Sequence, residues 1–237
     1  MMKPSLLSLL LLGPALMAAE PSLQSQLEAR SAESAKKGDP AVRSEYAKGI
    51  EAVAASGIVD KAKNVGDKAP DFTLKNATGK EVSLKSLLKD GPVVLTWYRG
   101  GWCPYCNIAM AALQKELPEI KKAGAQLVAL SPELPDKTLT TSEKNHLEFE
   151  VLSDTNHGVA DDYGIVFELT PKVRELYKSK FDLTEFNGKD AGDGKLPLAA
   201  TYIIDTDGTI RWAFLDADYR KRAEPSDIVD FLNEMAE

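Results

Sequence analysis

Cysteine and histidine are scarce in this sequence. Its 237 residues include two cysteines and two histidines. Two cysteines exclude a disulfide-rich scaffold and a zinc site made of four thiolates. The histidines, His146 and His157, lie in segments distant from the cysteines, so we expect no metal site. A glycine-rich phosphate loop and a nucleotide-binding fingerprint are also missing, and we therefore expect no bound cofactor.

The sequence also lacks an excess of positive charge. There are 29 Lys and Arg residues against 36 Asp and Glu residues, which gives a formal net charge of −7. A nucleic-acid partner needs a basic face that neutralises phosphates, so the acidic balance argues against one. Hydrophobic residues make up 43% and charged residues 27%, values typical of a globular chain. The length fits one domain with an appendage.

No apolar run is long enough to cross a bilayer, which takes roughly 20 residues. The N-terminal segment is nevertheless apolar. Lys3 supplies a positive start, residues 6–12 are apolar apart from one serine, and a helix-breaking Gly-Pro pair precedes a small-residue end. This layout is typical of a secretory signal peptide over residues 1–19, cleaved near Ala18 or Ala19, and a membrane anchor is the weaker alternative. We expect an exported, periplasmic protein without stable membrane insertion.

Residues 20–64 are predicted to form a helical extension. A Gly38-Asp39-Pro40 break divides it, with Asp39 as the N-cap and Pro40 at the first position of a second helix. Ser56-Gly57 is expected to end that helix. We expect both helices to pack on the main domain, which occupies residues 65–237.

The main domain alternates strand patterns with helical ones. Pro92 to Tyr98 (PVVLTWY) is predicted to be a buried central strand, and the helix that follows is stopped by Gly124. Asp207-Gly208 is a hairpin signal between two late strands. The pattern predicts an α/β fold with a central mixed β-sheet flanked by helices. Further strands are expected at 72–74, 81–84, 126–130, 149–152, 200–204 and 209–214, and a closing amphipathic helix at 225–235.

The two cysteines lie between the central strand and the helix after it. Cys103 and Cys106, in WCPYC, open that helix. A helix N-terminus carries a partial positive charge and free N–H groups, so it favours a thiolate over a thiol. Two sulfurs three residues apart can also close a disulfide. Arg99, just upstream, is always charged and can stabilise a thiolate or an oxyanion.

Three other interpretations of the cysteine pair are weaker. A structural disulfide with so small a loop constrains the unfolded chain little. A metal site would need more ligands than the nearby sequence offers. Two inert core cysteines would not be expected at a helix start, where thiols are reactive. A redox-active pair is therefore the favoured hypothesis.

The sequence from Val65 to Leu232 resembles the peroxiredoxin (AhpC/TSA, redoxin) branch of the thioredoxin-like superfamily. VGDKAPDFTL is similar to the entry strand of that branch, and PVVLTWYRGGWCPYCN to its central strand and active-site turn. TYIIDTDGTIRW is similar to its later strands, and YRGGWCPYC resembles an atypical C-x-x-C subgroup. The resemblance implies a thioredoxin-like fold and a thiol-dependent peroxidase that uses peroxide as substrate and a thioredoxin-like protein as reductant. A homodimer is one assembly to expect.

The match departs from the family pattern at the reactive residues. Counted as a peroxiredoxin, Cys106 occupies the peroxidatic position, while Cys103 and Arg99 replace the family's hydroxyl residue and proline. Ala199 stands where an arginine normally starts the strand that ends in IID. Counted as a thioredoxin, Cys103 would be the attacking thiol, but the facing cis-proline falls at Ala199 and the buried acid of the preceding strand is missing.

Three functional hypotheses follow. In the first, a peroxidase, the Cys106 thiolate attacks peroxide, Arg99 polarises it, and Cys103 condenses with the sulfenic acid to form a Cys103–Cys106 disulfide. In the second, an exported thiol–disulfide oxidoreductase, Cys103 attacks a protein disulfide and Cys106 resolves it. The third is a non-catalytic thioredoxin-fold binding module. The thiol with the greater exposure and the lower pKa discriminates between the first two.

Aromatic side chains near the cysteines are the candidate substrate-binding residues, namely Trp102, Tyr105 and Tyr98. Two other features are ascribed no function. The mixed-charge loop from Asp218 to Pro225 has no place that the sequence alone assigns, and His157, on a polar segment, is expected to be solvated at the surface.

Overall fold

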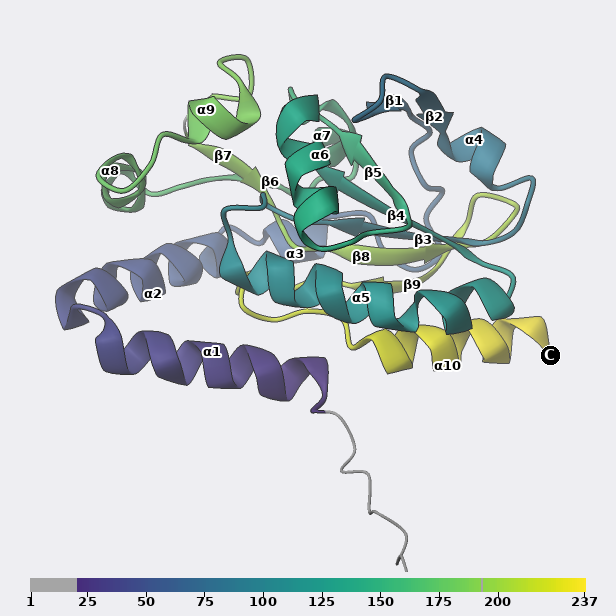
Figure 1. Cartoon of the computed structure of the whole chain (residues 1–237), viewed down its shortest axis with the longest axis horizontal. Coiled ribbons are helices and arrows are strands. Elements are labelled where there is room, and N and C mark those ends of the chain that lie inside the picture. Colours follow the sequence, from purple (N-terminus) through teal and green to yellow (C-terminus); the bar gives the residue numbers. More distant parts are fainter. Residues whose placement is uncertain (1–20, 193) are drawn as a thin grey trace, which may run out of the picture.

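The structure, a computed structural model, describes residues 21–192 and 194–237 (Figure 1). The expected signal peptide lies outside these residues. Nine strands are present: β1 (Thr73–Asn76), β2 (Glu81–Ser83), β3 (Val93–Trp97), β4 (Gln126–Ser131), β5 (Glu150–Ser153), β6 (Val166–Glu168), β7 (Lys195–Pro197), β8 (Thr201–Ile204) and β9 (Ile210–Phe214) in the described part of the chain.

The helices in the same residues are α1 (Leu23–Lys37), α2 (Pro40–Ala55), α3 (Ile58–Lys61), α4 (Leu84–Leu87), α5 (Pro104–Lys122), α6 (Pro135–Lys144), α7 (Gly158–Asp162), α8 (Pro171–Lys178), α9 (Leu183–Asn187) and α10 (Pro225–Ala236). None of these helices has the length and apolar character that crossing a membrane requires.

Seven strands form one mixed sheet in the order β2-β1-β5-β4-β3-β8-β9. The central strands β3, β4 and β5 are parallel, whereas β8 and β9 on one side, and β1 and β2 on the other, pair antiparallel. The β8–β9 hairpin turns at Gly208, whose φ of 79° suits glycine. The structure therefore confirms the predicted central mixed sheet with helices on its faces.

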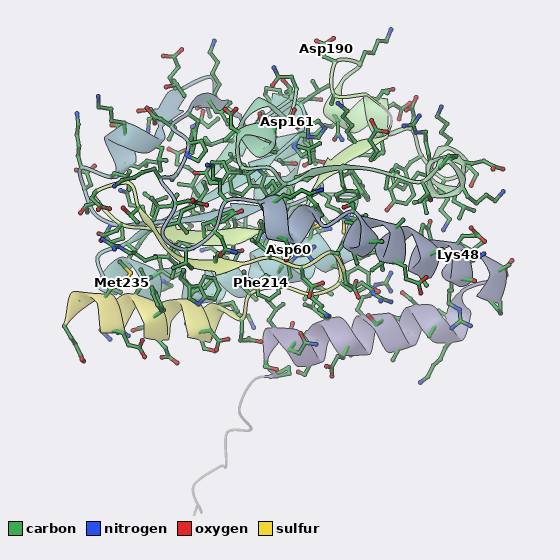
Figure 2. All side chains as sticks on the ribbon, turned by 180° about the vertical axis from the view of Figure 1, so that it is seen from behind. Lys48, Asp60, Asp161, Asp190, Phe214 and Met235 are labelled. Carbon is green, nitrogen blue, oxygen red and sulfur yellow. The ribbon has the colours of Figure 1, made fainter. Side chains whose placement is uncertain are left out.

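Side-chain alternation along the sheet gives the protein two hydrophobic cores. In β3, Val94 points into the core that α5 and α10 cover, whereas Val93, Leu95 and Trp97 point to the opposite face. Figure 1 shows α5 and α10 running side by side along the first face. In the reverse view of Figure 2, Phe214 lies beside α10, and it packs against this first core.

The N-terminal helices pack on the main domain as expected. Leu23 and Leu27 of α1 are buried in the core that contains α5. The Glu224 carboxylate accepts hydrogen bonds from the first backbone N–H groups of α1, at 2.8 Å from Leu23 and 3.0 Å from Gln24. Asp39 caps α2 through the Ala41 N–H, also at 2.8 Å. The start of α1 is thus tied to the start of α10.

Two local expectations are corrected by the structure. The strand predicted to reach Leu84 ends at Ser83, because the Ser83 hydroxyl accepts a hydrogen bond from the Ser86 N–H and starts α4. His157 is not at the surface: its side chain is 1% exposed, and it precedes α7 with a φ of 61°. Burial lowers the pKa of His157.

Candidate functional site

The cysteines lie where the turn after β3 leads into α5. Cys103 is the N-cap residue of α5 and Pro104 holds its first position, where a missing N–H costs nothing. The turn before them needs glycine at position 100, whose φ is 149° and where a Cβ would overlap the Trp102 ring. A proline at the helix start and a glycine in the turn are thus the local reasons for the position of the thiols.

Both cysteines are free thiols and both side chains are 0% exposed. They belong to the core that α5, α1 and α10 share. Each sulfur affects the ionisation of the other. The pair is therefore close enough to interact directly, and it is sealed from solvent.

Arg99 lies beside Cys103. Its Nη2 is 3.4 Å from Cys103 Sγ and its Nη1 donates to the Tyr177 hydroxyl at 3.1 Å. The guanidinium also stacks over the Tyr219 ring, 3.9 Å from the ring centroid, and lies 5.1 Å from the centroid of Trp102. The Arg99 side chain is 3% exposed, so its charge acts at short range in a medium with little water.

A second guanidinium lies beside Cys106. Arg222 is 8% exposed, and its Nη2 is 3.2 Å from Cys106 Sγ. Its Nη1 donates to the backbone carbonyls of Tyr219 and, at 2.7 Å, of Lys221. Arg222 comes from residues 215–224 between β9 and α10, called the 215–224 loop below, which also carries Tyr219.

The electrostatics favour a negative charge on the sulfur pair. Among the described residues, neither Arg99 nor Arg222 has a carboxylate partner, and a buried charge needs compensation. Burial opposes ionisation of Cys103, but the adjacent Cys106 and both guanidinium groups outweigh it, and they hold the Cys103 pKa well below its usual range. Burial and the adjacent Cys103 raise the pKa of Cys106. These contacts favour ionisation of Cys103 over ionisation of Cys106.

Aromatic rings enclose this charge cluster. Tyr105 packs edge-on against Tyr219, with ring centroids 5.7 Å apart, and its hydroxyl accepts a hydrogen bond from Ser31 of α1 at 3.3 Å. Trp102 packs against Tyr177. Tyr98 is fully buried in the same core as the thiols. The predicted substrate-binding aromatics thus form the walls of the site, not an open contact surface.

The buried carboxylate of Glu133 hydrogen-bonds to the active-site turn. Glu133 follows β4; its Oε1 accepts the Gly101 N–H at 2.9 Å and its Oε2 accepts the Thr141 hydroxyl at 3.3 Å. Burial raises the pKa of Glu133. Glu133 therefore fixes the backbone of the turn between Arg99 and Cys103.

Two hollows lead toward the site. A narrow pocket between α2 and α8 has room for about 20 Å³ and ends at Arg99, Tyr177 and Tyr219. The buried Nε of Arg99 has no hydrogen-bond partner among the described residues. A groove of about 640 Å³ between α1 and α2 has Tyr105 and Tyr219 among its lining residues. Tyr219 borders both hollows and stacks on Arg99.

The structure brings together most residues that the sequence singled out. Cys103, Cys106, Arg99, Trp102 and Tyr105 meet at one place, with Tyr98 behind them in the core. Sequence reasoning missed four participants that lie far away in the chain: Tyr177, Glu133, Tyr219 and Arg222. Two of them belong to the mixed-charge loop that the sequence left unplaced, and its arginines were the available signal.

No described group of three or more His, Cys, Asp or Glu side chains is arranged to hold a metal ion. Ala199 is buried and apolar, so the guanidinium next to Cys106 comes from a different part of the chain.

Comparison with known proteins extends this description. Residues 65–213 match the AhpC/TSA family model. Peroxiredoxin Bcp of Escherichia coli is 28% identical over 171 residues, which are 72% of this chain and 96% of that protein. The chloroplastic peroxiredoxin Q of Triticum aestivum is 29% identical over 161 residues, which are 68% of this chain and 63% of that protein.

Solved structures show the same fold. Peroxidoxin BcpB from Mycobacterium tuberculosis has a TM-score of 0.57 at 22% identity, covering 73% of this chain and 98% of its own. The Xanthomonas campestris bacterioferritin comigratory protein has a TM-score of 0.55 at 17% identity, covering 74% of this chain and 100% of its own. Because the family model covers more than half of the sequence, this chain belongs to the AhpC/TSA family of thiol-dependent peroxidases, with the thioredoxin-like fold of the peroxiredoxins.

Proposed function

We propose that this chain reduces small peroxides with Cys103 as the attacking thiolate and Cys106 as the resolving thiol. One observation carries the proposal: two buried guanidinium groups without a described carboxylate partner lie against the two sulfurs. Such a cluster stabilises a thiolate, which is the nucleophilic form of cysteine. The lowered pKa of Cys103 supports this residue as the attacking thiolate.

In the first step, the Cys103 thiolate attacks one peroxide oxygen and the O–O bond breaks. Cys103 becomes a sulfenic acid, and the leaving oxygen takes up a proton and departs as water or an alcohol. The Nε–H of Arg99, buried without a described partner beside the narrow pocket, is a donor that can polarise the O–O bond. The narrowness of the pocket beside Arg99 supports a small peroxide as the substrate.

In the second step, Cys106 attacks the sulfur of the Cys103 sulfenic acid. The S–O bond breaks, water leaves, and a Cys103–Cys106 disulfide forms. A thioredoxin-like protein then restores both thiols by disulfide exchange. This order differs from the sequence-based expectation that Cys106 attacks first, because the charges around the pair favour ionisation of Cys103.

Burial favours the peroxidase over an oxidoreductase that acts on protein disulfides. Thiol–disulfide exchange with a protein requires direct access to the attacking sulfur. Both cysteines are 0% exposed, so only a small molecule fits the closed, reduced form. We propose that the disulfide form opens to admit the protein reductant.

Stopped-flow mixing of the reduced protein with hydrogen peroxide tests this proposal, with tryptophan fluorescence as the signal because Trp102 adjoins the pair. A fast second-order phase is expected in the wild type and in Cys106→Ser, and it should vanish in Cys103→Ser. Rates no greater than those of a free thiol would reject the peroxidase. A fast phase that survives in Cys103→Ser and vanishes in Cys106→Ser would transfer the attack to Cys106.

We also propose that the protein is exported and that a signal peptide over residues 1–19 is removed. The positive start at Lys3 and the apolar run after it support this proposal. Mass spectrometry of the protein from fractionated cells should find the mature chain beginning after Ala18 or Ala19 in the periplasmic fraction. An intact N-terminus in the cytoplasm would contradict it. A homodimer is a further proposal, and sedimentation analysis of the mature protein tests it.

A further inference from the structure

The first chemical step does not explain the position of Arg222. Arg99 already lies beside Cys103, so the attacking thiolate has its own guanidinium. Arg222 lies beside the other sulfur, with Nη2 at 3.2 Å from Cys106 Sγ. It comes from the 215–224 loop, beyond residues 65–213 that the family model matches.

The second step needs a thiolate on Cys106, and the first step has already consumed the thiolate on Cys103. While Cys103 is a thiolate, its negative charge opposes ionisation of Cys106, and Cys106 keeps its proton. Once Cys103 has become a sulfenic acid, that negative charge is gone. Cys106 must then lose its proton in a fully buried place, where the charged form is unfavourable unless a positive group compensates it.

Arg222 can supply the positive charge that compensates a buried Cys106 thiolate. Backbone carbonyls of Tyr219 and Lys221 hold its Nη1, so its position depends on the fold of the 215–224 loop. Carbonyl groups carry no net charge, and no described carboxylate pairs with Arg222. Its positive charge therefore remains available to the sulfur at 3.2 Å, since a guanidinium keeps its charge even when buried.

We propose that Arg222 is a catalytic residue of the second step: its guanidinium stabilises the Cys106 thiolate that attacks the Cys103 sulfenic acid. This inference rests on the proposed function, with Cys103 as the first nucleophile. The proton of Cys106 leaves with the hydroxyl group of the sulfenic acid as water, while the sulfur–sulfur bond forms. The two arginines thus divide the cycle, with Arg99 serving the attack on peroxide and Arg222 serving disulfide formation.

The test separates the two steps in Arg222→Gln. The reduced protein is mixed with hydrogen peroxide and quenched at intervals with a sulfenic-acid reagent and an alkylating agent, and mass spectrometry then counts sulfenic acid, disulfide and sulfinic acid. Formation of the Cys103 sulfenic acid should slow much less than disulfide formation, because Arg99 remains beside Cys103. Disulfide formation should slow by about 10- to 100-fold, the effect expected from losing one charge-assisted hydrogen bond. Sulfinic acid should accumulate at Cys103.

Arg220→Gln is the matched control. Arg220 lies two residues away in the same loop, but it is half-exposed and pairs with Asp218 at 2.7 Å instead of a cysteine. Both steps should keep wild-type rates in this variant. If glutamine at position 222 prevents folding, the Arg222→Lys variant is measured in its place. Lysine keeps the charge but cannot reach the sulfur and both carbonyls with one planar group, so the second step alone should slow.

Three results would overturn the inference: disulfide formation within about twofold of wild type in the Arg222 variant, equal slowing of both steps, or slowing of the peroxide step alone. Failure of the proposed function looks different. In that case the wild type and Cys106→Ser would give no Cys103 sulfenic acid at all, whatever residue stands at position 222.

Discussion

Replacing Arg99 with glutamine removes the positive charge closest to Cys103 and leaves a neutral side chain that can still donate hydrogen bonds. The Arg99 Nη2 lies 3.4 Å from Cys103 Sγ, and the arginine is 3% exposed. A hydrogen bond to a charged group contributes about 1.5–3 kcal/mol net. Since one pKa unit corresponds to about 1.36 kcal/mol, we expect Arg99→Gln to raise the Cys103 pKa by about 1 to 2 units.

A direct Coulomb calculation sets an upper limit on this effect. Two unit charges about 4 Å apart interact with about 4 kcal/mol at an effective dielectric constant of about 20, which corresponds to roughly 3 pKa units. Arg222 remains in the variant and keeps part of the stabilisation, because its charge also lowers the Cys103 pKa. The smaller range is therefore the expectation.

The assay is the pH dependence of the ultraviolet absorbance of the thiolate in a Cys106→Ser background, where Cys103 is the single thiol. Because the thiol form lacks this absorbance, the signal falls as the pH drops through the Cys103 pKa. In Arg99→Gln this fall should begin at higher pH. Arg211→Gln is the control, since Arg211 is exposed and pairs with Asp205 instead of a cysteine. Superimposable profiles for Arg99→Gln and its parent would refute the electrostatic argument.

Three further outcomes follow from the packing and charges. Burial raises the pKa of Glu133, so the ionised carboxylate destabilises the folded protein as the pH rises through the folded-state pKa. The Glu133→Gln variant should therefore melt at a higher temperature than wild type at pH 7. Near pH 4 the two proteins should melt at the same temperature. An equal difference at both pH values would contradict this. Leu27→Ala should lower the free energy of unfolding by about 2–5 kcal/mol in urea titrations, because the Leu27 side chain of α1 is buried in the core that contains α5. A loss below about 1 kcal/mol would mean that α1 does not pack there in solution. Disulfide formation removes the negative charge of the sulfur pair that Arg222 contacts through Cys106. Amide hydrogen exchange in residues 215–224 should therefore be faster in the oxidised protein than in the reduced one, and equal exchange in both would speak against opening of this loop.

Some features of the site were accessible from the sequence because their signals are local. Pro104 at the first position of α5 and the glycines before it act on their immediate backbone, so the strand–turn–helix junction and its two cysteines were predicted. The Asp39-Pro40 helix start is local in the same sense. Each of these signals depends on the dihedral angles and N–H groups of a few neighbouring residues.

Which thiol attacks first stays a prediction, because it is not a local property of the sequence. Counting positions against the family pattern assigned the attack to Cys106, whereas the charges around the pair favour Cys103 as the thiolate. Position along the chain does not report the environment of a buried sulfur. That environment depends on which guanidinium groups, thiols and rings surround it after folding.

The sequence by itself determined the α/β class, the central strand, the cysteine pair and the family resemblance, because these depend on hydrophobic periodicity, local turn chemistry and the order of motifs. Only the tertiary structure placed Arg222 against Cys106, 116 residues away, and Tyr177 against Arg99, 78 residues away. It also decided that both thiols are sealed from solvent and that His157 is buried. Burial and long-range pairing arise from the packing of distant elements against one another, and no short stretch of sequence contains that information.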